Sequence, residues 1–339
     1  MSQQPHERRA SAWHDAGHQW KQGGLITAGV DIGLATSKSA VAADGKLIAY
    51  SSLWNGVDSP AGAEAALDAA LDGTGLSKGD IGFIVATGCG ADEVANAGRT
   101  VSEIACHARG AGRFMGPSLG TVLVMGGRDC VAIGCTGEGS VASFLTNACP
   151  PSNCRKNLCN ACGAAQGQAI EAVAEVLDVP IEEVGPMSLS ANEAELTKRL
   201  ALPFDDRGRI HDQLLEEIAE EVVLQGGASP LSGALGVVCA VLAKSMATGL
   251  LRNGWSKAEI LAAYCAALAH QAAMLARRLG IKEMLVVTGG VAKNVGVVKR
   301  LEAELGGKPV VMQPDPQIAA ALGAALYAQD FARRARNTC

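Results

Sequence analysis

The sequence is poor in aromatic residues, which make up only 4% of its 339 residues. It has no long basic run and a net charge of −5, so nucleic acid is disfavoured as a partner. Its longest apolar stretch, near residues 260–276, is interrupted by Tyr264, His270 and Gln271 and is therefore not expected to span a membrane. The chain also lacks an apolar signal core at its start. These absences predict a cytoplasmic protein with neither a membrane nor a nucleic-acid partner.

Glycine and aliphatic residues are abundant instead, with 41 glycines and 48% hydrophobic residues. This composition is typical of α/β proteins with tight turns and parallel or mixed sheets. The length suits about two domains with substantial cores. We expect a flexible N-terminal extension over residues 1–24, a first domain over 25–145 and a second over 146–339. The second domain would include a cysteine-rich insertion at residues 149–162.

Eleven cysteines without an export signal favour a reducing compartment and thiolate or metal chemistry over disulfides. Four of them, Cys149, Cys154, Cys159 and Cys162, have the spacing C-x4-C-x4-C-x2-C and precede an apolar segment, residues 169–177, that predicts a helix. Backbone N–H groups and the dipole at a helix start stabilise a thiolate. The stretch is therefore a candidate for a metal ion or an iron–sulfur cluster, and the alternative is a loop with free thiols.

A strand-turn-strand pattern lies near the start of the first domain. Residues 25–30 predict a strand, D31-I-G-L-A-T-S-K38 a turn, and residues 39–43 the returning strand. Backbone N–H groups of such a turn can surround a phosphate. Asp31 would hold Mg²⁺ through water, because a hard cation prefers carboxylate oxygen. Lys38 or Thr36 could reach a phosphate oxygen.

Two further strands end in glycine turns. Residues 121–125 lead into G126-G-R-D129, and residues 283–288 lead into G289-G-V-A-K-N294. The two aspartate-bearing turns fit a nucleotide with one Mg²⁺ between them, and the third turn suits its adenosine end. The candidate catalytic residues are Asp31 and Asp129, and the candidate nucleotide-binding residues are Gly33, Thr36, Ser37, Lys38, Gly126, Gly127, Gly289, Gly290, Lys293 and Asn294.

Residues 102–112 predict a helix in which Cys106 and His107 are either ligands or members of a buried face. Four stretches in this order, V30–V41, S102–A111, M125–I133 and V287–G296, resemble the ATPases that activate 2-hydroxyacyl-CoA dehydratases and power benzoyl-CoA reductases. That family lies within the acetate/sugar kinase, heat-shock cognate and actin superfamily. The resemblance, over residues 25–326, implies an α/β fold of two ribonuclease-H-like domains with ATP in the cleft between them.

The resemblance also implies a homodimer, or a pair of related subunits, that holds one [4Fe–4S] cluster with two cysteines from each subunit. The segments C162-G-A-A-Q-G167 and C239-A-V-L-A243 are similar to the two family segments that carry these ligands. Cys162 and Cys239 are therefore the candidate ligands. Cys149 is an alternative to Cys162, because T146-N-A-C149 resembles the family's lead-in to the first ligand and an insertion separates the two. The additional cysteines could hold a second cluster.

The function that the resemblance implies is ATP-driven electron transfer. Ferredoxin or flavodoxin would load the cluster, and ATP hydrolysis would drive a low-potential electron to an acyl-CoA dehydratase or reductase. Two residues depart from the family pattern: Arg128 stands where glutamine is common, and Lys244 where an acidic residue is common. The alternatives are a small-molecule kinase of the same superfamily with structural cysteines, and an ATP-binding subunit of a larger reductase.

Overall fold

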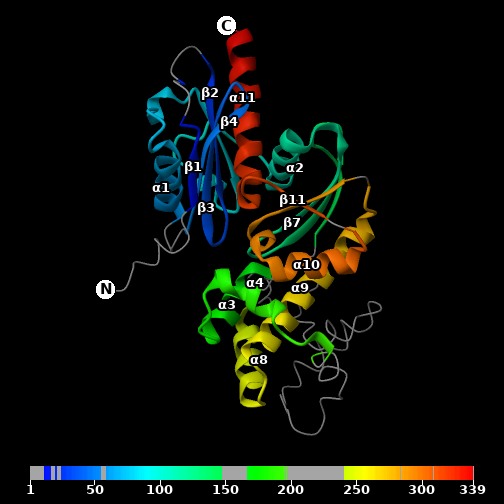
Figure 1. Ribbon diagram of the computed structural model, residues 1–339. Helices are drawn as coiled ribbons and strands as arrows, with labels where there is room; N and C mark the ends of the chain where they lie inside the picture. Colours follow the sequence, from blue (N-terminus) through cyan, green and yellow to red (C-terminus); the bar gives the residue numbers. More distant parts are fainter. Residues whose placement is uncertain are drawn as a thin grey trace, which may run out of the picture.

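The computed structural model describes residues 11–16, 20, 24–54, 59–146, 166–194, 196, 240–282, 284–307 and 309–338. This part of the chain forms two mixed β-sheets that are separated and covered by helices (Figure 1). The α/β class expected from composition is therefore confirmed.

The first sheet has the strand order β1-β4-β3-β2-β5-β6. Its strands are β1 (Ser11–His14), β2 (Ile26–Ile32), β3 (Thr36–Ala43), β4 (Lys46–Trp54), β5 (Phe83–Gly88) and β6 (Arg99–Thr100). The hairpin-connected β2, β3 and β4 are antiparallel, whereas β5 pairs in parallel with β2 and β6 pairs in parallel with β5. All seven residues of β2 are buried, as expected for the central strand of a sheet covered on both faces.

The second sheet repeats this plan with the order β11-β10-β7-β8-β9. Its strands are β7 (Leu119–Met125), β8 (Cys130–Thr136), β9 (Ser140–Thr146), β10 (Met284–Thr288) and β11 (Val310–Val311). The first three are antiparallel and the last two are added in parallel. Two sheets of the same topology match the two ribonuclease-H-like domains expected. The first sheet ends with β6 and the second begins with β7. β7, β8 and β9 therefore belong to the same sheet as β10, whereas the expected domain boundary at residue 145 groups nearly all of their residues with the first domain.

Helices alternate with the two sheets in layers. α1 (Ser59–Leu71) packs on the outer face of the first sheet, and α2 (Glu103–Met115) and α11 (Ala319–Thr338) lie between the sheets (Figure 1). α9 (Lys257–Leu279) covers the other face of the second sheet, and α10 (Val295–Leu305) packs on α9. Short 3-10 turns link these elements: η2 (Lys78–Asp80), η3 (Ala91–Glu93), η4 (Gly116–Ser118), η6 (Gly290–Lys293) and η7 (Pro316–Ile318).

Glycines let the central helices approach their neighbours at backbone distance. A Cβ atom at Gly29 of β2 would lie 2.0 Å from the Ala321 carbonyl oxygen of α11. Where α2 crosses α11, a Cβ at Gly110 would lie 2.0 Å from the Ala319 oxygen. Because only glycine fits such contacts, these glycines allow the close packing of α11 against β2 and α2.

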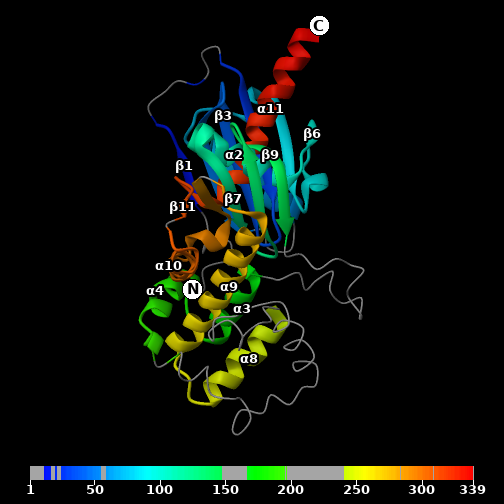
Figure 2. The same ribbon diagram turned by 90° about the vertical axis from the view of Figure 1, so that its right-hand side faces the viewer.

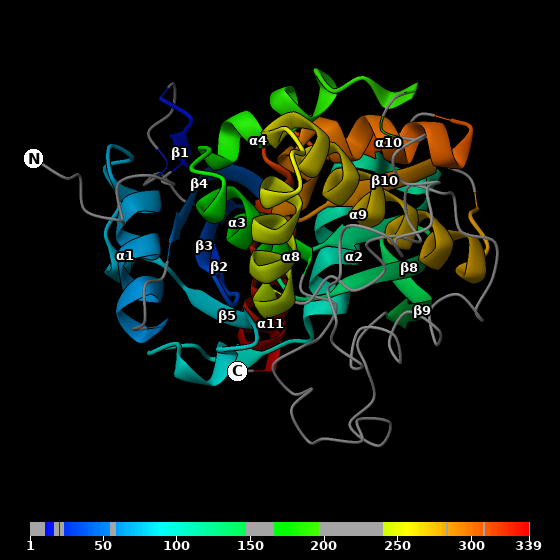
Figure 3. The ribbon, with the colours of Figure 1, turned by 90° about the horizontal axis from the view of Figure 1, so that it is seen from below.

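A helical group formed by α3 (Gln166–Val176), α4 (Ile181–Leu189), α8 (Ala240–Arg252) and the start of α9 projects below the sheets (Figures 2 and 3). A capping box begins α9, since the Ser256 hydroxyl accepts from the Glu259 N–H and the Glu259 carboxylate accepts from the Ser256 N–H. Among the described helices, α9 alone is long and apolar enough to cross a membrane by length and composition. Its apolar residues are buried in the core of the second sheet.

The N-terminal stretch departs from the expected flexible extension, because residues 11–14 form β1. This strand pairs antiparallel with β4, and Trp13 stacks on Tyr50 with ring centroids 5.8 Å apart. The free edge of β4 offers unpaired backbone groups that a further strand satisfies. A four-residue strand lacks the length at which alternation is a clear sequence signal, so the prediction missed it.

Candidate nucleotide-binding site

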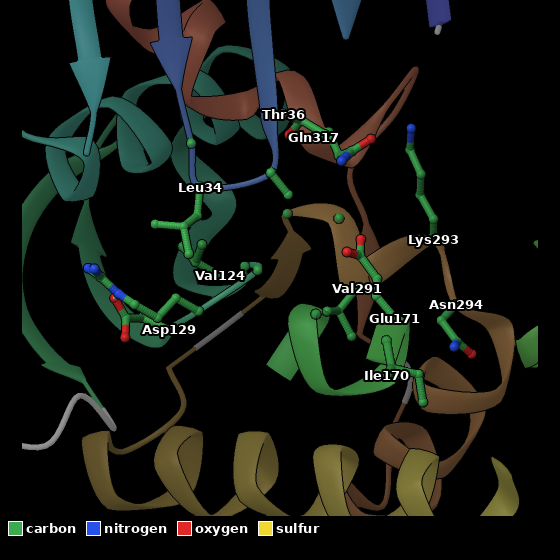
Figure 4. A pocket seen from close by; sticks show the side chains of 18 of the residues that line it. Leu34, Thr36, Val124, Asp129, Ile170, Glu171, Val291, Lys293, Asn294 and Gln317 are labelled. Atoms are coloured by element: carbon green, nitrogen blue, oxygen red, sulfur yellow. The ribbon is translucent and has the colours of Figure 1, made fainter. Parts of the chain in front are cut away.

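A cleft of about 540 Å³ lies between the two sheets, where the ends of β2, β5, β7 and β10 meet the first turns of α2 and α3. This volume is within the range of small-molecule sites. Figure 4 shows side chains from all sides of the cleft, with Thr36 and Leu34 from the first sheet opposite Asp129 and Val291 from the second. The three turns singled out in the sequence therefore face one another.

Asp31 and Lys38 form a buried ion pair beside the first turn. The turn is shorter than the sequence predicts, because Asp31 lies in β2 and Lys38 lies opposite it in β3. The Lys38 Nζ lies 2.8 Å from Asp31 Oδ2, and the two side chains are only 9% and 3% exposed. The other carboxylate oxygen, Oδ1, is buried and has no hydrogen-bond partner among the described residues. Burial raises the pKa of Asp31, while Lys38 opposes that rise. The ionised carboxylate is thus held at an energetic cost that a cation or a proton donor at Oδ1 would reduce.

Gly88 makes room for this carboxylate. It has a φ of +87°, and a Cβ atom there would lie 2.4 Å from Asp31 Oδ1. Any side chain would therefore meet both a strained backbone and the carboxylate. The sequence signal was available, since Gly88 ends a buried strand in T87-G-C-G90, but its role depends on the parallel pairing of β5 with β2.

The second turn holds Asp129 less tightly. The Gly126 N–H donates to the Asp129 carbonyl oxygen at 3.0 Å and closes the turn. The Arg128 Nε donates to Asp129 Oδ2 at 2.8 Å, and this hydrogen bond raises the pKa of Arg128. The Asp129 side chain is 23% exposed overall, but its Oδ1 is buried and accepts no hydrogen bond from the part of the chain that the structure describes. Each aspartate therefore has one unsatisfied oxygen at the cleft.

Helix α3 begins directly on the second turn. The Gly167 N–H donates to the Gly126 oxygen at 3.2 Å, and the Gln168 N–H donates to the Gly127 oxygen at 2.9 Å. A Cβ at Gly167 would lie 2.9 Å from the Gly127 Cα. The start of α3 is therefore bonded directly to the glycine turn and packed closely against it.

The third turn follows β10 and leads into α10. Gly289 has a φ of +91°, and its N–H donates to the Pro316 oxygen at 2.7 Å. Lys293 forms an ion pair with Asp315 at 2.7 Å. The Asn294 side-chain oxygen caps α10 by accepting from the Gly296 and Val297 N–H groups. Asn294 thus fixes the helix start at the cleft wall.

A carboxylate, an imidazole and a hydroxyl line up at the start of α2. Glu103 Oε1 lies 3.6 Å from His107 Nε2, and His107 Nδ1 lies 3.1 Å from the Thr288 hydroxyl. A carboxylate only accepts, so the His107 Nε2 proton faces Glu103, while the Thr288 hydroxyl, which can donate or accept, bonds to Nδ1. The nearby imidazole lowers the pKa of Glu103 and keeps it ionised. Glu103 is half-exposed toward the cleft, whereas His107 is buried.

The structure brings nearly all the predicted nucleotide-site residues together. Ser37 differs, because it is fully buried in β3 and does not line the cleft. The candidate ligands Cys149, Cys162 and Cys239 lie outside the described residues. Sequence reasoning gave no role in the nucleotide site to several lining residues, namely Cys89, Glu103, His107, Glu171 and Gln317.

The described cysteines do not form a metal centre. Within the described ranges, no group of three or more His, Cys, Asp or Glu side chains is placed to hold a metal ion. Cys106, Cys130, Cys135 and Cys265 are each buried, and burial raises the pKa of Cys106 to about 12. Such a thiol stays protonated and is a poor ligand. The buried-face alternative for Cys106 and His107 is the one observed.

Comparison with known proteins identifies the family. Residues 28–328 match the BadF/BadG/BcrA/BcrD ATPase family. The chain belongs to this family and is an ATPase. A relative, the activator of lactoyl-CoA dehydratase from Anaerotignum propionicum, is 31% identical over 310 residues, which are 91% of this chain and 100% of that protein. The family resemblance of the sequence motifs is thereby confirmed.

Two solved structures have the same fold over nearly their full length. The activator of the 2-hydroxyisocaproyl-CoA dehydratase from Clostridium difficile, with bound ADPNP, has a TM-score of 0.70 and 26% identity, covering 93% of this chain and 98% of that one. Component A of the (R)-2-hydroxyglutaryl-CoA dehydratase from Acidaminococcus fermentans has a TM-score of 0.68 and 27% identity, covering 91% and 99%. These likenesses extend the family relationship to the architecture of both sheets.

Proposed function

We propose that this ATPase is an activator that uses ATP to deliver a low-potential electron to an acyl-CoA dehydratase or reductase. The family and the names of its relatives support the activator role. The observation that supports coupling between ATP and the cluster is the pair of backbone hydrogen bonds that joins α3 to the Gly126–Gly127 turn. α3 begins four residues after the candidate ligand Cys162. A change at the phosphate-binding turn is thus passed directly to the helix that follows the cysteine-rich segment.

Nucleotide and magnesium fit the cleft. The unsatisfied oxygens of Asp31 and Asp129 are the hard donors that Mg²⁺ prefers, directly or through water. The Lys38 ammonium group and backbone N–H groups of the Gly126–Gly127 turn would attract phosphate oxygens, and the third turn would border the adenosine. When bound, Mg²⁺ neutralises the charge that develops on the transferred phosphoryl group.

Glu103 would orient the water that attacks the phosphoryl group. It is ionised, it faces the cleft, and its electrostatic interactions with Asp31 and Lys38 place it beside the first turn. His107 positions this carboxylate and is itself held by Thr288 at the end of β10. Because phosphoryl transfer depends mainly on positioning and charge, a held carboxylate at this place is sufficient for the role.

Cys162, or Cys149 in its place, and Cys239 would hold a [4Fe–4S] cluster, which supplies one-electron transfer at low potential. Cys239 directly precedes α8 in the sequence, and α8 packs on α3 with Lys244 2.6 Å from Glu175. The two helices that follow the candidate ligands therefore form one unit seated on the phosphate turn. With two ligands from each of two subunits, the protein would be a homodimer in the cytoplasm, with ferredoxin or flavodoxin as donor.

Anaerobic purification of the Cys239→Ser protein tests this proposal. We expect loss of bound iron, of the cluster chromophore and of the dimer, while affinity for Mg-ATP is kept because the cleft does not include α8. Cys135→Ser is the matched control, since this cysteine lies in β8 and should retain iron. Full iron content in Cys239→Ser would overturn the ligand assignment. An iron-free wild-type protein that phosphorylates a small molecule would favour the kinase alternative.

A further inference from the structure

The strand β1 lies outside the family match, which begins at residue 28. It is nevertheless part of the cleft, because Ser11 lines it together with the residues of the three turns. β1 joins the first sheet through β4, with Ser11 opposite Ser52, Ala12 opposite Ser51 and Trp13 opposite Tyr50. An element beyond the shared family region thus supplies a side chain to the nucleotide site.

Ser11 holds the carboxylate that binds Lys293. The Ser11 hydroxyl donates to Asp315 Oδ2 at 3.2 Å, and the same oxygen accepts from Lys293 Nζ at 2.7 Å. The second oxygen, Oδ1, accepts from the Gln317 N–H at 2.9 Å. The Asp315 side chain is 6% exposed, so its charge depends on these partners rather than on water.

Ser52 of the neighbouring strand β4 makes a similar contact, with Gln317. Directly opposite residues of antiparallel strands project to the same side of the sheet, so Ser11 and Ser52 reach the same segment. The Ser52 hydroxyl donates to Gln317 Oε1 at 3.4 Å, and a Cβ at Gly290 would lie 2.9 Å from Gln317 Nε2. Both serines therefore connect the first sheet, through residues 315–317, to the third turn that carries Gly290 and Lys293.

We propose that β1 completes the nucleotide site of this chain, with Ser11 as a positioning residue that fixes Asp315 and Lys293 when the third turn closes on a bound nucleotide. The proposal rests on the proposed role of the cleft as the nucleotide site. Without the Ser11 hydroxyl, Lys293 is the remaining described donor to Asp315 Oδ2. The Lys293 side chain is 41% exposed, so its ammonium group can turn from the carboxylate to water. The third turn is then less ordered in the free protein, so nucleotide binding must also order the turn, and this lowers the affinity.

The test compares steady-state Mg-ATP hydrolysis by the full-length wild type, Ser11→Ala and Ser11→Thr. Loss of one hydrogen bond to a charged group should raise KM roughly three- to ten-fold with kcat little changed. Ser11→Thr keeps the hydroxyl and should restore the wild-type KM. Ser77→Ala is the matched control, because the Ser77 hydroxyl also donates to a carboxylate, that of Asp80 at 2.7 Å, at an exposed site away from the cleft.

A double-mutant cycle with Lys293→Met separates positioning from a general effect on stability. If Ser11 acts through Lys293, Ser11→Ala should add little to the KM of Lys293→Met. An unchanged KM in Ser11→Ala, or full additivity in the cycle, would overturn this inference while leaving the proposed function intact. Failure of the wild type to bind Mg-ATP would instead overturn the nucleotide site itself.

Discussion

The first and second turns occupy equivalent places in two sheets of the same topology, yet they hold their aspartates differently. Asp31 is almost fully buried and paired with a buried lysine, whereas Asp129 is partly exposed and paired with the more exposed Arg128. The pKa of Asp31 is raised by burial. Each aspartate keeps one carboxylate oxygen without a hydrogen-bond partner within the described ranges.

The two aspartates are also anchored to different kinds of element. The Asp31–Lys38 pair is set within antiparallel strands, with Asp31 directly opposite Lys38 in the register. The turn around Asp129 is instead bonded to the start of α3, an element that continues the cysteine-rich segment. We infer that the first turn defines where magnesium and phosphates sit, and that the second reports their presence to the helical group.

The comparison is tested most strongly by Asp31→Asn. It removes a carboxylate from the proposed magnesium and phosphate site, so the rate of Mg-ATP hydrolysis should fall at least ~100-fold. It also leaves Lys38 buried without its counter-charge, which should lower the free energy of unfolding by about 3 kcal/mol. Steady-state kinetics and urea unfolding measure the two effects.

The partly exposed pair of Arg109 and Asp330, 2.9 Å apart, provides a control that is more accessible to water than the Asp31–Lys38 pair. Asp330→Asn should change the free energy of unfolding by less than about 1 kcal/mol, because water reaches both partners. An Asp31→Asn protein that folds normally and hydrolyses ATP at the wild-type rate would rule out the assignment of the first turn.

Asp129→Asn should separate activity from stability. Loss of the Asp129 carboxylate should also reduce the rate of hydrolysis about 100-fold, since it faces the same proposed magnesium and phosphate site. The free energy of unfolding should change by less than about 1 kcal/mol, because Arg128 regains solvation at this partly exposed site. A destabilisation equal to that of Asp31→Asn would show that the two turns are equivalent after all.

Glu103→Gln addresses the role assigned to the start of α2. The expected result is a fall in kcat of roughly 10- to 100-fold with little change in KM, because the amide can still accept a hydrogen bond but orients water less strongly. Thr288→Val removes only the hydroxyl that holds His107 and should have a smaller effect of the same kind. Unchanged kcat in Glu103→Gln would exclude this residue from the reaction.

Much of this arrangement was predictable because strands and turns carry local signals. The strand ending in Asp31 and the turn G126-G-R-D129 follow from apolar runs and glycine placement alone. Gly88 and Glu103 were not predictable in their roles, because these depend on which strands pair and on how α2 enters the cleft. β1 was missed because it is stabilised by the edge of β4 rather than by its own sequence.

The smallest expected effect concerns the pH dependence of kcat/KM, which reports groups of the free enzyme. Burial raises the pKa of Asp31, so the acid limb should lie above the ordinary aspartate value of about 3.9. Glu103 raises this pKa further through its negative charge, and Lys38 lowers it. Glu103→Gln should therefore move the acid limb to lower pH, and Lys38→Met should move it to higher pH. Shifts of the same sign in both variants would mean that a group other than Asp31 controls the acid limb.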